Sequence, residues 1–394
     1  MFLTKIMKKL SLLHIILIIL LILIIFLYNH SSLFIKTEEH MTDVVPLSTI
    51  PSSTSSGSGD GSGGGSGGDY LQSLQQKENR IFPFRYFTDT SGTVLPYVAV
   101  TGFFRDDIAK QKYYEYLKNG IYIFGITAYK TFPNRYMLDK SEGEYERNDG
   151  FDYVGNITNW LCCFKKKAAY GFTANNKLFD MSESDFYTAD NRSLPKKYDF
   201  IYICNKDSDR CPLDGWNAIN RNYNLALKCF PMLCMQFNMK GLIVGRVNCG
   251  LEYQPYAKNL EITDWLEWHV LQDKMRESKM LFVPNVFDAS PRVIAECITK
   301  NVPVLMNRNI LCGTKYITPE TGELFTDEVD IQVALIKMVE KIRDIANNAV
   351  SPRNWWLKHY SEETSQKKLR DFLYESFPVN PNPLESIDRV KFIL

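Results

Sequence analysis

Two acidic residues, Asp288 and Glu296, lie eight positions apart in the segment DASPRVIAE. Asp288 falls in a short polar loop, whereas Glu296 falls in a segment with the apolar periodicity of a helix. Because a helix rises about 1.5 Å per residue, a loop and its first turns can bring both carboxylates to one side of a ligand. A sugar nucleotide offers hydroxyls for both: the sugar to Asp288 and the ribose to Glu296.

The elements around this pair predict a βαβ unit. Met280–Val283 is a short apolar run ended by Pro284, which is typical of a buried parallel strand. Ser290 can cap the following helix and Pro291 suits its first turn, and Val302–Met306 predicts the next strand. Such a unit places the start of the helix at the carboxyl edge of a sheet, where anions and nucleotides bind.

The segment from Ser278 to Phe325 resembles the donor site of group 1 (family 4) glycosyltransferases of the GT-B fold. The family signature is an acidic residue, seven others and a glutamate, here DASPRVIAE, followed by NVPVL and TGELF for the family's Gly-Pro-Val strand entry and Thr-Gly stretch. The chain also departs from the pattern. Asp288 is one methylene shorter than the usual Glu, and Pro291 replaces the usual loop Gly, which removes an amide donor. Arg292 can supply a charge-assisted contact instead.

The resemblance implies an α/β, GT-B-like fold of two Rossmann-like domains facing a cleft, with the last helix, Leu369–Phe377, crossing back to the first domain. It also implies transfer of a sugar, hexosyl or related, from a nucleotide-sugar donor to a glycan, protein or other hydroxyl acceptor. The anomeric configuration would be retained, and neither a metal nor a cofactor is implied.

In the same family, a basic residue after each early strand of the donor domain binds the diphosphate. By position, Arg221 or Lys228 follows the strand Phe200–Cys204, and Arg246 follows Leu242–Val244. The expected catalytic residues are Asp288 and Glu296, and the expected donor-binding residues are Ala289, Ser290, Arg292, Arg246, Arg221 and Lys228.

Two further segments are expected at the site. Ile262–Lys274, with Trp265 and Trp268, would frame the base, although two tryptophans at this spacing can also pack into a core. Asp185 or Glu183, after a strand in the first domain, would orient an acceptor hydroxyl; the alternative is that they cap a turn.

The length of 394 residues predicts two domains with appendages. Lys5, Lys8 and Lys9 precede the apolar run Leu10–Tyr28, which is long enough to span a bilayer. This charge asymmetry predicts a single-pass type II membrane protein with a lumenal, Golgi/ER-like catalytic part; a cleaved signal peptide is the alternative. The expected regions are a cytoplasmic tip and transmembrane anchor (1–28), a flexible Ser/Gly-rich stem (29–81), an acceptor-side α/β domain (82–195), a nucleotide-sugar-binding domain (196–377) and a tail (378–394).

The first domain is expected to contain an α/β layer of its own. Its strands are predicted at Tyr97–Val100, Ile121–Ile126, Trp160–Phe164 and Lys177–Met181, and a helix ends near Lys118. The stretches NGIYIFGIT, NWLCCF and MSESDF resemble viral and algal membrane-anchored glycosyltransferases. Asn156 and Asn191 begin possible glycosylation triplets.

The net charge and the cysteine content limit the partners and the disulfides that the sequence allows. The formal net charge of +1 does not indicate a nucleic-acid partner. The nine cysteines argue against a complete disulfide framework, because their number is odd, but Cys204 with Cys211 and Cys229 with Cys234 remain possible pairs. Several cysteines lie in apolar segments, where a free thiol behaves as a small hydrophobe.

Two alternatives remain open from the sequence. Asp207 and Asp209 form a DxD pattern after a predicted strand, and GT-A transferases hold a manganese ion with such a pattern. The second alternative is a non-catalytic, membrane-tethered glycan-binding module, because no histidine lies between His40 and His269 to act as a base in the first domain.

Overall fold

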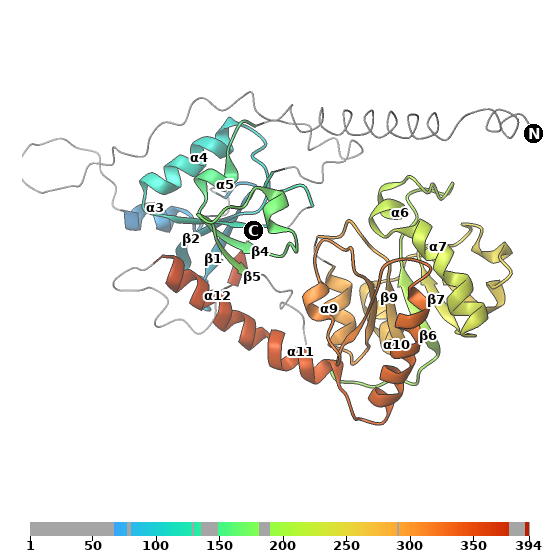
Figure 1. The fold of residues 1–394 in the computed structure, drawn as a ribbon. Coiled ribbons are helices and arrows are strands. Elements are labelled where there is room, and N and C mark those ends of the chain that lie inside the picture. Colours follow the sequence, from blue (N-terminus) through green and yellow to red (C-terminus); the bar gives the residue numbers. More distant parts are fainter. Residues whose placement is uncertain are drawn as a thin grey trace, which may run out of the picture. The chain divides into compact units, whose positions relative to one another are not determined.

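The computed structural model describes residues 67–76, 80–127, 130–134, 149–180, 190–289, 291–377 and 391–393. The expected anchor, most of the stem and most of the tail lie outside the described residues, as do Glu183, Asp185 and Ser290. None of the helices within the described ranges combines the length and hydropathy needed to cross a bilayer. The described chain contains two six-stranded sheets (Figure 1).

The first sheet has the strand order β12-β1-β2-β3-β4-β5. Strands β2 to β5 are parallel, whereas β1 pairs antiparallel with both β2 and β12. The predicted α/β layer is therefore confirmed for four strands, and the antiparallel edge was not predicted. The strands are β1 (Phe84–Thr88), β2 (Val94–Val100), β3 (Tyr122–Ile126), β4 (Asn159–Cys162), β5 (Lys177–Asp180) and β12 (Lys391–Ile393).

Helices cover both faces of the first sheet. Helix α4 (Asp107–Lys118) begins where the Asp106 side chain accepts a hydrogen bond from the Ala109 amide, and it packs on one face through Tyr113 and Tyr116. Helix α12 (Glu362–Ser376) packs on the other face through Phe372 and Leu373. The last long helix thus returns to the first sheet, as the resemblance implies.

Two short helices complete the region built around the first sheet. Helix α3 (Gly67–Ser73) lies within the segment predicted to be a flexible stem, and Leu74, directly after it, is buried in the first core. The structured part therefore begins earlier than residue 82. Helix α5 (Tyr153–Asn156) and a 3₁₀ turn (Lys167–Tyr170) flank β4.

The second sheet is entirely parallel, with the order β11-β10-β9-β6-β7-β8. Counted along the chain this order is 6-5-4-1-2-3, which is that of doubly wound dinucleotide-binding folds. The winding direction reverses between β6 and β9, so these neighbours form the topological switch point. The strands are β6 (Tyr198–Ile203), β7 (Gly241–Val244), β8 (Leu260–Thr263), β9 (Ser278–Val283), β10 (Val304–Asn307) and β11 (Gly322–Phe325).

Two helix layers enclose the second sheet. Helices α7 (Tyr223–Pro231) and α10 (Ile331–Ala346) pack on one face. Helices α8 (Trp268–Arg276), α9 (Arg292–Ile298) and α11 (Pro352–Tyr360) pack on the other. Shorter elements are helix α6 (Trp216–Asn220), 3₁₀ turns at Leu251–Tyr253, Ala257–Asn259 and Thr314–Tyr316, and a π turn at Met232–Gln236.

The sequence predicts no strand at TGELF, yet four of its five residues form strand β11. Gly322 begins this strand beside Val304 of β10. A Cβ atom at Gly322 would lie 2.1 Å from the Val304 carbonyl oxygen, so the close pairing requires a glycine.

Candidate active site

The switch point of the second sheet brings Arg221 and Asp288 together. Arg221 directly follows α6 in the connection after β6, and Asp288 lies in the loop after β9. Arg221 Nη1 donates to Asp288 Oδ2, and Asn285 Nδ2 donates to the same oxygen at 3.1 Å. The Asp288 side chain is mostly buried, whereas the Arg221 side chain is 34% exposed. The pair therefore combines an ordered carboxylate with an accessible guanidinium.

A second contact joins the same two segments. Asn222, directly after Arg221, has a positive φ of 48° and donates from Nδ2 to the Pro284 carbonyl at 3.1 Å. The connection from α6 to α7 is thus tied to the end of β9. The sequence analysis did not single out Asn222 or Asn285. The available signal was their position, because Asn222 directly follows the predicted site residue Arg221 and Asn285 lies just after the predicted strand that ends at Val283.

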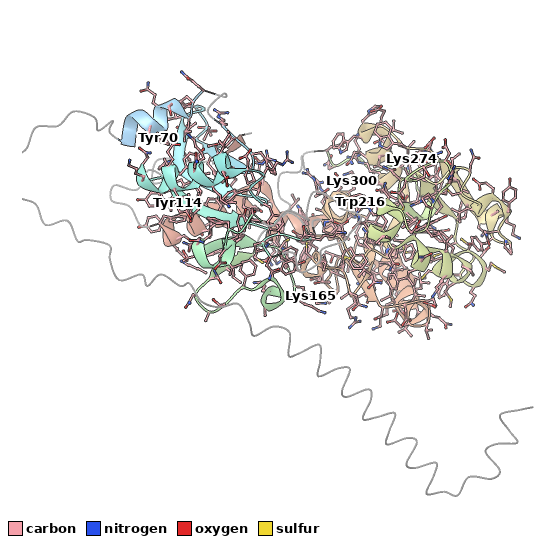
Figure 2. The ribbon with its side chains drawn as sticks, turned by 90° about the horizontal axis from the view of Figure 1, so that it is seen from above. Tyr70, Tyr114, Lys165, Trp216, Lys274 and Lys300 are labelled. Carbon is pink, nitrogen blue, oxygen red and sulfur yellow. A yellow bond between two sulfur atoms is a disulfide. The ribbon has the colours of Figure 1, made fainter. Side chains whose placement is uncertain are left out.

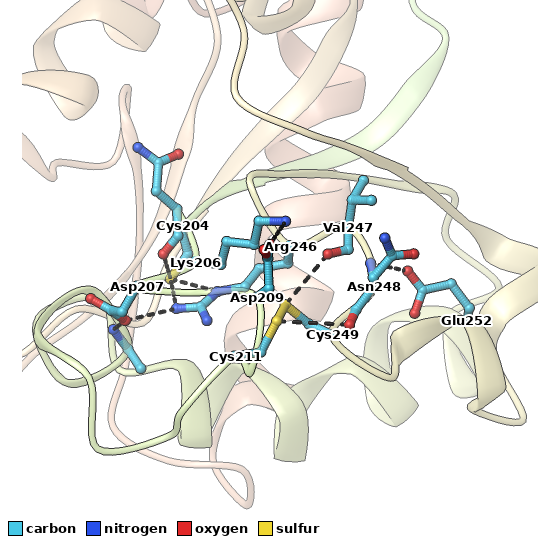
Figure 3. The surroundings of a disulfide bond; sticks show 12 residues. Cys204, Lys206, Asp207, Asp209, Cys211, Arg246, Val247, Asn248, Cys249 and Glu252 are labelled. Carbon is cyan, nitrogen blue, oxygen red and sulfur yellow. Dashed lines mark hydrogen bonds and ion pairs between the residues drawn. A yellow bond between two sulfur atoms is a disulfide. The ribbon is translucent and has the colours of Figure 1, made fainter.

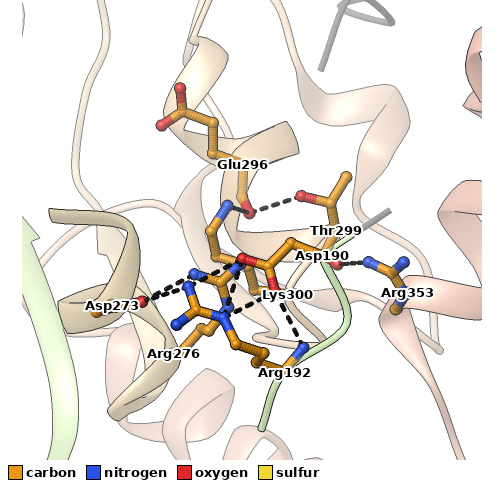
Figure 4. Close-up of polar contacts among 8 residues, drawn as sticks. All are labelled: Asp190, Arg192, Asp273, Arg276, Glu296, Thr299, Lys300 and Arg353. Atoms are coloured by element: carbon orange, nitrogen blue, oxygen red, sulfur yellow. Dashed lines mark hydrogen bonds and ion pairs between the residues drawn. The ribbon is translucent and has the colours of Figure 1, made fainter. Parts of the chain in front are cut away.

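Glu296 has different partners from Asp288. Its Oε2 atom accepts a hydrogen bond of 3.4 Å from Gln272 Nε2, which belongs to α8. Its carbonyl accepts from Thr299 and Lys300, and its carboxylate points away from the ion cluster around Asp190 (Figure 4). A ligand shared by the two acids stays a prediction.

Arg246 is completely buried beside the loop that follows β6. It donates from Nη2 to Cys204 Sγ at 2.9 Å and lies 3.9 Å from Asp207 Oδ2 (Figure 3). Its Cζ atom lies over the Tyr223 ring, 4.3 Å from the ring centroid. Nη1 has no hydrogen-bond partner among the described residues. Burial raises the pKa of the Cys204 thiol, and the Arg246 charge opposes that shift. Arg246 therefore supports the loop after β6 from within the protein interior.

The other predicted donor-binding residues are placed less favourably. Lys228 is exposed and forms an ion pair of 3.0 Å with Glu328. Arg292 is exposed at the start of α9. Ala289 is buried, and its carbonyl accepts from Cys312 Sγ at 2.6 Å and from Cys163 Sγ at 3.1 Å. Arg221, by contrast, contacts the candidate acid Asp288.

The DxD carboxylates are engaged separately. Asp207 caps α6, because its two oxygens accept from the Asn217 and Ala218 amides at 2.7 and 3.2 Å. Asp209 is exposed and pairs with Lys206 at 2.9 Å (Figure 3). Within the described ranges, no group of three His, Cys, Asp or Glu residues could hold a metal ion. Asp207 and Asp209 thus have separate partners, and the manganese alternative stays a prediction.

A disulfide joins Cys211 and Cys249, whose Cα atoms are 5.5 Å apart. It links the loops that follow β6 and β7, so both pairings left open by the sequence are wrong: Cys204, Cys229 and Cys234 are buried thiols. The reason is that parallel neighbours bring together loops distant in sequence. All nine cysteines lie in described residues, and the seven free ones are buried, as predicted for small hydrophobes.

The tryptophans of the predicted base-framing segment do not pack into the core. Trp265 follows β8 and Trp268 begins α8, and their exposed fractions are 59% and 61%. The core alternative is therefore wrong, and framing of the base stays a prediction.

No family model matches the sequence, and no curated protein matches it. Among solved structures the chain is similar to TarM, with 12% identity and a TM-score of 0.47 over 64% of this chain and 50% of TarM. It thus spans half the length of TarM, which has also been solved with UDP. It is also similar to the lipopolysaccharide outer core galactosyltransferase WaaB, with 11% identity and a TM-score of 0.49 over 79% of each chain. A glycosyltransferase from Rickettsia africae has 10% identity and a TM-score of 0.49, with 72% of this chain and 77% of that chain covered.

The names of the last two structures denote glycosyltransferases. The resemblance of the first half to viral and algal proteins stays a prediction.

Proposed function

We propose that this protein is a glycosyltransferase that moves a sugar from a nucleotide-sugar donor to a hydroxyl group of a glycan or another acceptor. The observation that carries the proposal is the Arg221–Asp288 pair at the switch point of the second sheet. Doubly wound sheets bind ligands outside the carboxyl ends of their strands at this point. A guanidinium suits a diphosphate, and a carboxylate accepts hydrogen bonds from sugar hydroxyls.

The chemistry follows from this placement. Arg221 would bind the donor diphosphate and stabilise the negative charge that develops as it departs, because a pre-oriented cation needs no reorganisation during the reaction. Asp288 would hold the donor sugar, and Glu296 the ribose. The acceptor hydroxyl oxygen forms a bond to the anomeric carbon while the bond to the diphosphate breaks, and the hydroxyl proton passes to the departing diphosphate. Retention of configuration and independence of a metal are proposed from the family resemblance.

Thermal unfolding with UDP-, GDP- and ADP-linked sugars tests the proposal, since a ligand that binds the native state raises the melting temperature. We expect one nucleotide class to stabilise the protein and Arg221→Ala to remove most of that shift. Transfer should be lost in Glu296→Ala without loss of folding. Failure of every nucleotide sugar to bind would leave the glycan-binding module as the better description. Activity lost with EDTA and restored by manganese would favour the metal-dependent alternative.

We also propose that residues 10–28 anchor the protein and that the two sheets lie in a lumenal compartment. The Cys211–Cys249 disulfide supports this, because disulfides persist in oxidising compartments. The triplet residues Asn156 and Asn191 are both exposed. Endoglycosidase treatment should therefore increase the gel mobility of the protein expressed in eukaryotic cells. Protease sensitivity of the domains in intact microsomes would contradict the assignment.

A further inference from the structure

Exposed tryptophans are concentrated at one edge of the second sheet. The chain has six tryptophans, all within the described ranges. Trp160 and Trp356 are completely buried and Trp355 is partly buried, whereas Trp216, Trp265 and Trp268 are exposed. The exposed three follow β6 and β8, so they lie in connections at the carboxyl edge. Trp265 and Trp268 belong to the predicted base-framing segment, which leaves Trp216 without a role.

The backbone that carries Trp216 is held at several points. Asp207 accepts hydrogen bonds from the backbone amides of Asn217 and Ala218, the two residues after Trp216. Asn220 Nδ2 donates to the Trp216 carbonyl at 2.9 Å. The Cys211–Cys249 disulfide fastens the preceding loop (Figure 3). The Trp216 side chain, labelled in Figure 2, is 50% exposed. Because its backbone is already held, a ligand that packs on this side chain loses little affinity to backbone ordering.

Trp216 is also close to the Arg221–Asp288 pair along the chain. It begins α6, and Arg221, five residues later, is the residue that directly follows the same helix. At the rise of an α-helix, five residues correspond to about 7.5 Å along the axis. A disaccharide can bridge that span. Trp216 and the Arg221–Asp288 pair thus lie at the two ends of one short helix.

The charges around Trp216 favour a neutral ligand. The loop from Lys206 to Asp214 carries two basic residues and three acidic ones, so it offers no excess positive charge for an anionic glycan or a lipid phosphate. Leu213 adds a second exposed apolar side chain, and the Asp214 side chain is exposed beside it. An apolar surface next to a carboxylate suits a pyranose, which has a face of C–H groups and a rim of hydroxyls.

We propose that Trp216 stacks on a neutral pyranose ring of the acceptor glycan. That this glycan is the acceptor rests on the proposed function; that a neutral sugar packs on Trp216 does not. The residue would set acceptor affinity and would not take part in bond breaking.

Saturation-transfer NMR of the full chain with methyl glucopyranoside, galactopyranoside and mannopyranoside in the presence of UDP tests the proposal. At least one pyranoside should receive saturation from the wild type, and Trp216→Ala should remove that signal while Trp216→Phe retains much of it. In a transfer assay, Trp216→Ala should raise the acceptor KM about tenfold at an unchanged donor KM. Tyr374→Ala removes another exposed aromatic, on α12, and should change neither quantity.

Three results would overturn the proposal: no pyranoside signal with the wild type, a signal that survives Trp216→Ala, or a loss of UDP affinity in Trp216→Ala that indicates base stacking. Failure of the proposed function would look different. In that case no nucleotide sugar stabilises the wild type, while the pyranoside signal and its dependence on Trp216 still decide whether the indole binds sugar.

Discussion

Arg221 and Asp288 form an ion pair although 67 positions separate them in the chain. Their contact follows from the strand order, because β6 and β9 are hydrogen-bonded neighbours and each residue lies in a connection beyond the carboxyl end of its strand. Asn285 donates to the same Asp288 oxygen as Arg221. The candidate site is thus organised around one carboxylate oxygen.

Replacement of Arg221 should weaken donor binding more than replacement of Lys228. Loss of a charge-assisted contact should lower nucleotide-sugar affinity roughly tenfold to hundredfold in Arg221→Ala. Lys228 is exposed and paired with Glu328, so Lys228→Ala should have a smaller effect. Calorimetric titration of both variants measures the difference. Equal losses would mean that both residues contact the diphosphate, as the sequence allowed.

The thiol count should separate the disulfide from the buried cysteines. Without reductant, the unfolded protein should react with Ellman's reagent at seven thiols, and with prior reduction at nine, since two of the nine cysteines form the disulfide. In the native state, burial raises the pKa of Cys229, Cys234 and Cys297 to about 12 each, so their labelling should remain slow between pH 7 and 9. Nine reactive thiols without reductant would show that Cys211 and Cys249 are not bonded.

The ion cluster of Asp190, Arg192, Asp273 and Arg276 should make the stability of the protein sensitive to acid. Asp190 accepts from Arg192 and from the buried Arg276 at 2.6 Å (Figure 4). Hydrogen bonds from Arg192, and then the charge of Arg276, lower the Asp190 pKa from 3.8 to about 2. Ionised Asp190 therefore contributes stability above pH 3.8, and that contribution is lost as the pH falls to about 2.

Urea unfolding across this pH range measures the effect. The free energy of unfolding should fall less steeply with acid in Asp190→Asn than in the wild type. As a control, Asp209→Asn removes an exposed carboxylate paired with Lys206, whose hydrogen bond lowers the Asp209 pKa to a smaller extent than that of Asp190. This variant should therefore change the acid dependence less than Asp190→Asn does. Parallel curves for Asp190→Asn and the wild type would contradict the assigned shift.

Replacement of Arg246 should lower the stability of the fold more than it changes the affinity for the donor. A lysine cannot reproduce the contacts of the guanidinium with Cys204, Asp207 and the Tyr223 ring, so Arg246→Lys should lower the free energy of unfolding by about 2–4 kcal/mol. Urea unfolding provides the measurement. If the variant keeps its stability and loses nucleotide affinity, Arg246 contacts the donor, as the family resemblance implies.

The local sequence pattern was enough to predict most strands and helices of the region built around the second sheet. The apolar run at β9 and the periodic apolar residues of α9 predict that strand and helix, because burial of one face is encoded within a few residues. Strand β11 was missed because a short segment with a glycine has little intrinsic strand preference, and its pairing with β10 decides its state.

Local patterns in the sequence predict parallel α/β units, with Asp288 before a helix start and Glu296 after it. The contact of Arg221 with Asp288, the bond between Cys211 and Cys249 and the contacts of the buried Arg246 follow from the fold and not from any local pattern. Each of these contacts joins connections after different strands. The physical reason is that strand order, and not distance along the chain, sets which loops meet at the carboxyl edge of a parallel sheet.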